Sequence, residues 1–252
     1  MLFLEEPRQI VLDAEERPSD SPFVTRVWRS DSYSESGKPF TSIAEIYYEM
    51  VVTKYQGRVT MTVRGPETVA TPAYRPPDME WIGIQFTHGT VIPNLSPGVL
   101  KDRCDVDLPG AGDQSFWLHG AAWQFPDFEN ADTFVDRLVR DGLLVHEPVV
   151  SAVLQGQPPS MSLRTVQRRF LQATGMTHGT LSQIRRAHRA AVLLIQGVPI
   201  LDTVYLAGYA DQPHLTRSLK HYIGQTPAQL ADPTGDQLLS FLFDTPLLED
   251  QS

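Results

Sequence analysis

The most constraining feature of this sequence is an internal repeat, because one helical segment in the carboxy-terminal half occurs twice, 49 positions apart. Ser162–Phe170 aligns with Asp211–Leu219. The same offset continues beyond these segments and pairs Gly175 with Gly224, Thr177 with Thr226 and Leu181 with Leu230. A duplication of this kind indicates two copies of one supersecondary structure.

Each copy has the pattern of a short amphipathic helix with a cap at either end. It begins with an N-cap residue, spaces two apolar residues four positions apart, and places an arginine on the opposite face. Each copy ends at a glycine, after which a threonine is suited to cap the next helix. These residues are Ser162, Val166, Phe170 and Arg168 in the first copy, and Asp211, Leu215, Leu219 and Arg217 in the second. A duplicated helix with an arginine-bearing outer face is typical of a pair of DNA-reading helices.

The distribution of charge supports this interpretation. The 252-residue chain has a net charge of −9, which by itself argues against a nucleic-acid partner. Residues 1–141 carry a net charge of −9, residues 142–232 carry +4, and the tail from residue 233 carries −4. The positive charge therefore lies where the repeat lies.

Composition also excludes several classes of protein. No run approaches the roughly 18 apolar residues of a membrane span, and the acidic amino terminus is unlike a signal peptide. Cys104 is the one cysteine, which excludes an internal disulfide framework and suits a reducing compartment. Its acidic neighbours disfavour a thiolate, so an unreactive thiol is expected. We expect a cytoplasmic protein without a membrane partner.

The amino-terminal half has the alternation and the β-branched and aromatic content of strands. Strands are predicted at 23–28, 43–53, 59–63 and 80–87, with Gln56-Gly57 as the turn of a hairpin. Ile10–Leu12 adds at most one short strand. These segments predict a small antiparallel barrel or sandwich over residues 1–130.

Helices are predicted from Asn130 onward. A helix from Ala131 to Asp141 carries the apolar stripe Phe134, Val135 and Leu138, and residues 131–146 connect the two halves. Residues 147–232 form the second domain, with helices predicted at 148–154, 162–174, 177–196, 200–207, 211–223 and from 226. Residues 233–252 form an acidic tail. The fold class is therefore α+β.

The helix over 177–196 would be roughly 28 Å long, close to the separation of about 34 Å between successive major grooves. Two helix-turn-helix units joined by such a helix resemble the DNA-binding domain of the AraC/XylS family of transcriptional regulators. The resemblance rests on Ser162-x-Arg164-Thr165-Val166-Gln167-Arg168-x-Phe170, Thr174-Gly175-Met176-Thr177, Arg186-Ala187-x-x-Ala190-x-x-Leu193-Leu194, Gly208-Tyr209-x-Asp211-Gln212-x-His214-Leu215-Thr216-Arg217-x-Leu219-Lys220 and Gly224-x-Thr226-Pro227. The β-domain resembles the cupin-like sensory domains of the family in its position and class.

The resemblance implies contacts to base edges and to phosphates. The base-reading residues are expected to be Arg164, Gln167, Arg168, Gln212, His214 and Arg217. Phosphate contacts are expected from Thr165, Thr216 and Lys220. The chemistry agrees, because arginine pairs with guanine and glutamine with adenine in the major groove. The partners implied are double-stranded DNA, RNA polymerase, a small-molecule effector and a second copy of the chain. Contacts between the two copies are expected from the β-domain or from the helix Ala131 to Asp141.

The sequence departs from the family pattern at three places. Val204 stands where alanine is usual, so the second helix pair is expected to be slightly wider. Pro158-Pro159 occupies the turn of the first unit, and Pro213 stands where a polar base-reader is common. Arg169 points one step round the helix, toward the DNA backbone or solvent, and His188 is interpreted as a packed histidine.

In the β-domain, five aromatic residues are candidates for an effector pocket, although core packing is the commoner role for any one of them. They are Trp28, Tyr47, Tyr55, Trp81 and Phe86. His88 and His119 form no close pair, so no metal is expected. No phosphate-binding loop or catalytic triad is present, so neither a cofactor nor an enzymatic activity is expected.

Two hypotheses from different classes follow. The first is a sequence-specific transcriptional regulator whose β-domain senses an effector or dimerises. The second is a small-molecule-binding or enzymatic β-barrel protein whose helical half mediates protein contacts. The local positive charge and the paired Arg/Gln faces favour the first.

Overall fold

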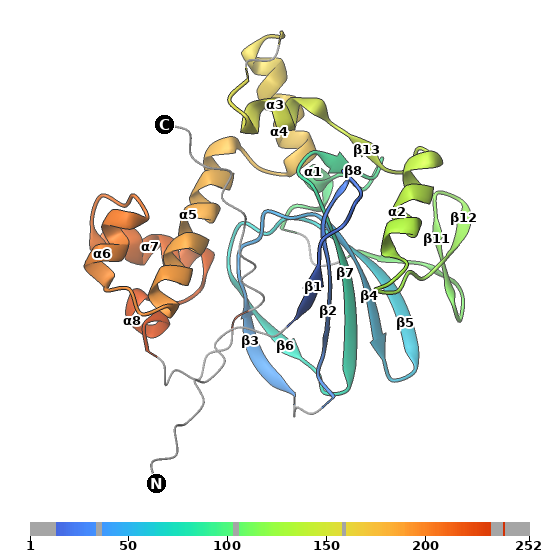
Figure 1. The fold of residues 1–252 in the computed structure, drawn as a ribbon, viewed down its shortest axis with the longest axis horizontal. Helices are drawn as coiled ribbons and strands as arrows, with labels where there is room; N and C mark the ends of the chain where they lie inside the picture. The colour runs from blue at the N-terminus through green and yellow to red at the C-terminus, as the bar shows by residue number, and fades with distance from the viewer. Residues whose placement is uncertain (1–13, 34–36, 103–105, 158–159, 233–238, 240–252) are drawn as a thin grey trace.

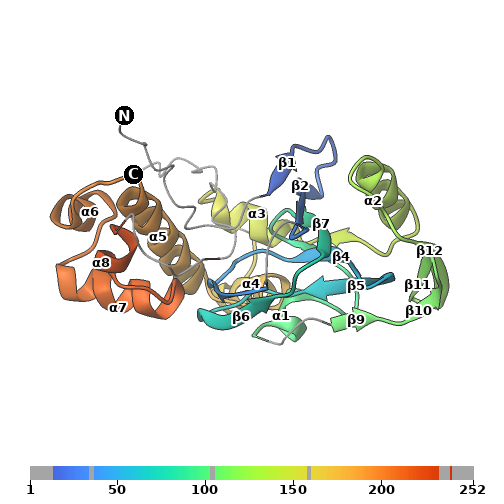
Figure 2. The same cartoon turned by 90° about the horizontal axis from the view of Figure 1, so that it is seen from below.

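The computed structural model describes residues 14–33, 37–102, 106–157, 160–232 and residue 239. Antiparallel strands fill the amino-terminal half and helices fill the carboxy-terminal half, so the predicted α+β class is confirmed (Figures 1 and 2). The expectations for Ile10–Leu12, Cys104, Pro158-Pro159 and most of the acidic tail fall outside the described residues.

The largest sheet has six strands in the order β1-β2-β7-β4-β5-β9. Its strands are β1 (Glu15–Arg17), β2 (Val24–Asp31), β4 (Glu49–Tyr55), β5 (Arg58–Arg64), β7 (Met79–Phe86) and β9 (Val106–Leu108). The predicted hairpin is present, because Gln56 and Gly57 turn with φ of 49° and 75° between β4 and β5. The described strands form no closed barrel, since the sheet ends at β1 and β9.

Three smaller antiparallel sheets surround this one. They are the pair β3 (Lys38–Ser42) and β6 (Thr71–Arg75), the pair β8 (Thr90–Val91) and β13 (Val145–His146), and the meander β10 (Gly110–Gly112), β11 (Ser115–Leu118) and β12 (Ala121–Gln124).

One face of the six-stranded sheet is the core of the β-domain. Alternate residues of β4, β5 and β7 pack there against α2 (Ala131–Arg140), as period-2 alternation requires. The predicted stripe Phe134, Val135 and Leu138 is buried in this core. The apolar side of α2 is therefore covered within the chain, so this stripe does not support the expected dimer contact through the helix, and the dimer itself stays a prediction.

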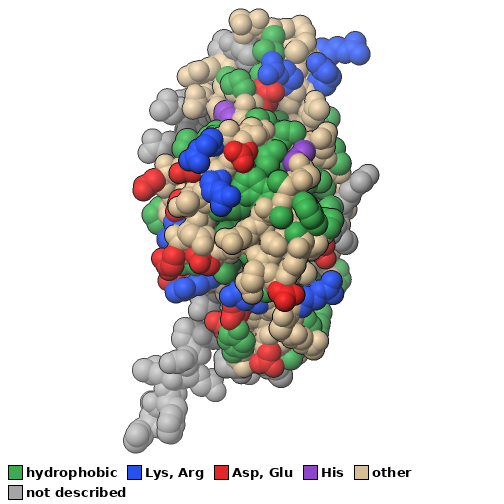
Figure 3. Space-filling model, turned by 90° about the vertical axis from the view of Figure 1, so that its right-hand side faces the viewer, with side chains coloured by type: hydrophobic (Ala, Val, Ile, Leu, Met, Phe, Trp, Pro, Cys, Tyr) green, Lys and Arg blue, Asp and Glu red, His purple; other side chains and the backbone are tan. Residues whose placement is uncertain are grey.

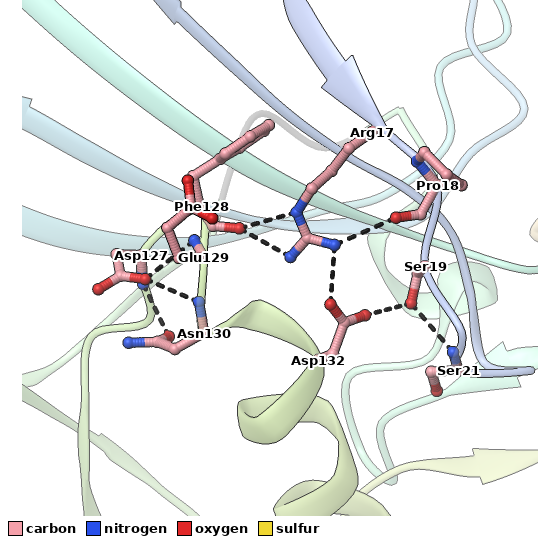
Figure 4. A network of polar contacts seen from close by, with 9 residues as sticks. All are labelled: Arg17, Pro18, Ser19, Ser21, Asp127, Phe128, Glu129, Asn130 and Asp132. Atoms are coloured by element: carbon pink, nitrogen blue, oxygen red, sulfur yellow. Dashed lines mark hydrogen bonds and ion pairs between the residues drawn. The ribbon is translucent and has the colours of Figure 1, made fainter.

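A polar network fixes the start of α2 beside β1 (Figure 4). The guanidinium of Arg17 donates to the Phe128 carbonyl from Nε (3.0 Å) and Nη2 (2.7 Å), and pairs with Asp132 at 2.7 Å. The Ser19 hydroxyl donates to the same carboxylate. Although burial opposes ionisation, the Ser19 hydroxyl and Arg17 together lower the pKa of Asp132.

The strand predicted over Ile43–Thr53 is wrong in its first half, because β4 begins at Glu49. The preceding residues bond elsewhere: the Ala44 N–H donates to the Tyr222 carbonyl at 2.7 Å, and Glu45 exchanges backbone bonds with Glu67. Ile43 and Ile46 are buried against the helices. Their apolar pattern reflects packing on the second domain.

The helices agree with the prediction to within one or two residues. They are α3 (Pro148–Leu154), α4 (Leu163–Thr174), α5 (His178–Ile195), α6 (Ile200–Leu206), α7 (Gln212–Tyr222) and α8 (Pro227–Leu230), with a further short helix, α1 (Pro97–Leu100), in the β-domain. Figure 1 shows α5 between the pair α3–α4 and the group α6–α8. Among the described residues, no helix is long and apolar enough to cross a membrane.

The two halves share one hydrophobic cluster. It combines Ile43, Ala44, Ile46 and Tyr47 of the β-domain with apolar residues of α3 to α8 and with Leu239, whose backbone pairs with Thr41. His188 of α5 is buried there, and its Nε2 donates to the Ala44 carbonyl at 2.7 Å. His188 is therefore a packed, hydrogen-bonded histidine, as its place on the apolar side of α5 predicts.

Candidate nucleic-acid interface

The first helix-turn-helix unit consists of α3 and α4. Ser162 caps α4, because its hydroxyl accepts from the Thr165 N–H at 3.3 Å. Val166 and Phe170 are buried on the inner side of α4. The helix ends at Gly175, which has a φ of 74°.

The outer side of α4 carries two parallel rows of exposed side chains. One row holds Arg164 and Arg168, and the neighbouring row, at spacing i, i+4, i+8, holds Leu163, Gln167 and Leu171. All five are exposed, with Leu163 at 71% and Leu171 at 45%. The three predicted base-reading residues of this unit therefore lie together on one accessible helix face.

Arg169 is expected from the sequence to face the DNA backbone or solvent, but in the structure it forms an ion pair within the protein. Its guanidinium pairs with the carboxylate of Glu147, with Nε at 2.9 Å and Nη2 at 2.8 Å. The same carboxylate caps α3 by accepting from the Val149 N–H. This ion pair ties α4 to the start of α3, so Arg169 positions the helix pair.

The second unit consists of α6 and α7, with Gly208 (φ 71°) in the turn between them. Asp211 caps α7 by accepting from the His214 N–H at 2.7 Å, and Pro213 is accommodated in the first turn. Gln212, Arg217 and Lys220 are exposed. They form the outer face of α7, equivalent to that of α4.

Three of the predicted DNA-contacting side chains make contacts inside the protein. The ring of His214 is half-buried and packs edge-to-face on Tyr209, with centroids 5.1 Å apart. The Thr216 hydroxyl donates to the Gln212 carbonyl at 2.9 Å, and that of Thr165 lies 2.9 Å from the Ser162 hydroxyl. Each lies at the edge of its exposed face.

Side chains of the long helix α5 contact the second unit and hold it in position. The Arg186 guanidinium lies 4.7 Å from the centre of the Tyr209 ring, and its Nη1 donates to the Gly208 carbonyl at 3.3 Å. The Tyr222 hydroxyl donates to Gln183 at 2.7 Å. Val204 of α6 is half-buried against the shared core.

The β-domain contacts both recognition helices at equivalent places, a relation that the sequence does not reveal. A Cβ on Gly175, at the end of α4, would lie 2.7 Å from Pro66 and 2.8 Å from the Pro97 carbonyl. A Cβ on Gly224, just after α7, would lie 2.8 Å from Thr41. These two glycines are paired by the repeat, and each allows the close approach of the β-domain. We call this pair of contacts the double clamp.

Backbone hydrogen bonds reinforce the clamp at the second unit. The Tyr222 carbonyl accepts from Ala44, and the His221 carbonyl accepts from the Ala70 N–H at 2.9 Å. These carbonyls lie in the last turn of α7, where intrahelical donors are lacking. The β-domain therefore completes the hydrogen bonding of this helix end.

The five aromatic candidates in the β-domain do not form one cluster. Trp28, Tyr55 and Trp81 share the face of the six-stranded sheet opposite its core, as the strand register shows. Phe86 lies on the core face beside Tyr48. Tyr47 lies at the junction with the helices, stacked on His88 at 5.6 Å.

The face that carries Trp28 also carries buried polar groups that sequence patterns do not single out. The Nε of Arg26 donates to Gln85 at 2.9 Å and its Nη1 pairs with Glu16 at 2.5 Å. The Trp28 indole donates to Glu49 at 2.9 Å. Burial, aided by Glu49, raises the pKa of nearby Glu45. Within the described part of the chain, no group of three His, Cys, Asp or Glu residues is placed to hold a metal.

Comparison with known proteins identifies the helical region. Residues 159–232 match a family model described as a helix-turn-helix domain. The chain is similar to the HTH-type transcriptional regulator RipA of Corynebacterium diphtheriae, with 32% identity over 74 residues, which are 29% of this chain and 22% of RipA. The chain thus spans about a fifth of the length of that relative. No solved structure matches.

The helical region is a double helix-turn-helix of the kind that places two recognition helices on one scaffold. The matched model and relative confirm the resemblance for this region: residues 159–232 are a helix-turn-helix domain of the AraC/XylS type. The match begins after α3, although the structure pairs α3 with α4 through Glu147.

Proposed function

We propose that this chain is a sequence-specific DNA-binding transcriptional regulator whose two helix-turn-helix units read neighbouring major grooves. One observation carries the proposal: two repeat-related helices, α4 and α7, present exposed arginines from a region that matches a helix-turn-helix family. The 18 residues of α5 separate the units by roughly 27 Å. This separation approaches the groove repeat of B-DNA.

The proposed base contacts come from Arg164, Gln167 and Arg168 in the first unit and from Gln212, His214 and Arg217 in the second. Thr165, Thr216 and Lys220 are proposed to contact phosphates. The ring of His214 also packs on Tyr209. Arginine and glutamine at exposed positions of the helix amino-terminal half suit direct readout of guanine and adenine.

The β-domain, residues 1–130, is proposed to sense a small-molecule effector. The supporting feature is the sheet face with Tyr55 and Trp81, which are both partly exposed, while Trp28 on the same face is buried. The Arg75 guanidinium lies 5.1 Å from the Trp81 ring, and Arg26 is buried. Aromatic surfaces beside buried charged groups suit a ligand with both apolar and polar parts. Residues 131–146 would connect this domain to the DNA-binding domain, residues 147–232.

The double clamp supplies the coupling. Because the β-domain contacts the carboxy-terminal ends of both α4 and α7, a change in its conformation alters how the two helices sit relative to each other. A ligand that binds one arrangement more tightly shifts the population toward it. RNA polymerase is the proposed downstream partner.

A homodimer is proposed on a surface other than the apolar stripe of α2. The side of the molecule that carries α2 and β11 shows a hydrophobic area near its centre, bordered by both acidic and basic side chains (Figure 3). Trp117 of β11 is 45% exposed. Sedimentation of the full chain, with and without DNA, measures the assembly.

The function is tested by selecting duplexes from a random library with the full chain and measuring binding to a selected and a scrambled duplex. A regulator of this kind should prefer the selected duplex by at least about 1000-fold and lose affinity steeply as salt rises. Equal, salt-insensitive binding to both duplexes would refute the proposal and favour a protein-interaction role for the helices.

A further inference from the structure

The outer face of α4 carries two exposed leucines that the internal packing does not use. Leu163 is 71% exposed in the first turn and Leu171 is 45% exposed two turns later. Both lie off the buried stripe of Val166 and Phe170. Single exposed leucines are common on protein surfaces, so exposure alone does not indicate a function. The position of these two on the helix is what can indicate one.

The position is specific, because both leucines share one helix row with Gln167. This Leu–Gln–Leu row runs beside the row of Arg164 and Arg168. In the second unit the repeat places Gln212, Thr216 and Lys220 in the same row. The two recognition helices therefore differ in chemistry along one row, apolar and amide in α4 but entirely polar in α7.

The major groove offers one apolar group to such a row, the C5-methyl of thymine. Leu163 stands in the first turn of α4, and the amino-terminal residues of a recognition helix approach the base edges most closely. It lies four residues from Gln167, a rise of about 6 Å or less than two base-pair steps. A glutamine that pairs with adenine places thymines within reach of this leucine.

We propose that Leu163 reads a thymine methyl group, an apolar contact that the polar row of the second unit does not make. This inference rests on the proposed DNA-reading function and adds a specificity-determining residue to it. On binding, the exposed leucine and the thymine methyl leave water together, which favours thymine over a base without a methyl at that position.

The test replaces thymines by uracil in a duplex selected by the full chain, because uracil keeps every hydrogen-bonding group and lacks only the methyl. The half read by the first unit is identified as the half where Arg168→Ala relaxes base preference. There, one thymine-to-uracil change should weaken wild-type binding roughly fourfold, the effect of one methyl-sized apolar group. Uracil in the other half should leave the affinity unchanged.

The variant Leu163→Ala should bind the thymine duplex more weakly and show no further loss with uracil at that position. Leu201→Ala is the matched control, because Leu201 is 72% exposed on α6, outside the recognition helices. It should retain the wild-type uracil effect. Thermal melts establish that both variants are folded.

The inference is overturned if no thymine in the first half shows the uracil effect, or if Leu163→Ala keeps it. Either outcome leaves the DNA-reading function intact, since discrimination between selected and scrambled duplexes is measured in the same titrations. Loss of that discrimination in the wild-type chain would instead refute the proposed function.

Discussion

Arg168 and Arg217 occupy equivalent positions on two helices, and both are exposed. Substituting either by alanine should relax preference at particular base pairs and cost about 1–3 kcal/mol of binding free energy to the selected duplex. Lys220→Ala should weaken binding to all sequences alike and reduce the salt dependence by about one ion. Titrations against selected and scrambled duplexes at several salt concentrations measure both effects.

Stability separates these effects from damage to the fold. Phe170 is buried, so Phe170→Ala should lower the free energy of unfolding by about 3–5 kcal/mol through the cavity it leaves. The arginine variants should melt close to wild type. If they melted like Phe170→Ala, or kept full discrimination between duplexes, their assignment to the groove would be wrong.

A second prediction for a single residue concerns how the stability of the fold depends on pH. Burial lowers the pKa of His188 from 6.5 to about 4, although its bond to Ala44 acts in the opposite direction. As pH falls, the unfolded chain binds a proton at His188 before the folded chain does. The contribution of neutral His188 to the free energy of unfolding is therefore at its full value above about pH 6.5. It is lost as pH falls toward 4, by up to about 3 kcal/mol.

The variant His188→Gln cannot titrate and should show a smaller loss of stability between pH 6.5 and 4, measured by melts across this range. Some dependence should remain. Burial and the nearby Arg185 lower the pKa of His88 to about 3, so His88 acts with the same sign. An unchanged pH dependence in the variant would contradict the role given to His188.

Residues with local roles could be predicted, and residues with distant partners could not. The caps at Ser162 and Asp211 follow from spacing within one helix turn. The bond from His188 to Ala44 spans 144 positions, and no local pattern contains it. The ion pair of Arg169 with Glu147 was missed for the same reason, because its two residues belong to different helices.

At the scale of elements, the double clamp makes a quantitative prediction. Gly208 and Gly224 both have a left-handed backbone, but a Cβ on Gly208 meets nothing within 4 Å while one on Gly224 meets Thr41. Gly208→Ala should therefore cost about 1 kcal/mol of stability for its conformation alone. Gly224→Ala should cost about 1–3 kcal/mol more, because the methyl group pushes against the β-domain.

Thermal unfolding of the two variants measures this difference, and DNA titration shows whether loosening the clamp changes affinity. Equal stability of the two variants would show that the β-domain does not press on this helix end in solution.

Element boundaries were predictable where the period and the caps agree, as in α3 to α8. They failed where tertiary contacts use strand-like residues for another purpose. Ile43, Ala44, Ile46 and Tyr47 pack on the helices, and Ala44 bonds to α7, so the composition of this stretch resembles that of a strand. The pairing of β3 with β6 was also not predicted, because the two strands are separated by β4 and β5 in sequence.

At the scale of the whole molecule, we expect the helical half to be less stable when it is separated from the β-domain, because the two halves share one hydrophobic core. A fragment of residues 143–252 keeps both helix-turn-helix units and the positive region, and should still bind duplex DNA at low salt. It loses the contacts of Ile43, Ile46 and Tyr47, so it should unfold at a lower temperature than the full chain. A folded fragment that binds no DNA would refute the assignment of DNA binding to residues 147–232.

The double clamp has a thermodynamic consequence for the sensing domain. If the arrangement of α4 and α7 favoured by an effector differs from that favoured by DNA, each ligand must change the affinity of the other by the same factor. The operator is then itself an effector of the β-domain. The affinity of the chain for its small molecule should differ between the free protein and the DNA-bound protein. If DNA raises this affinity, the small molecule promotes DNA binding; if DNA lowers it, the small molecule releases the protein from DNA.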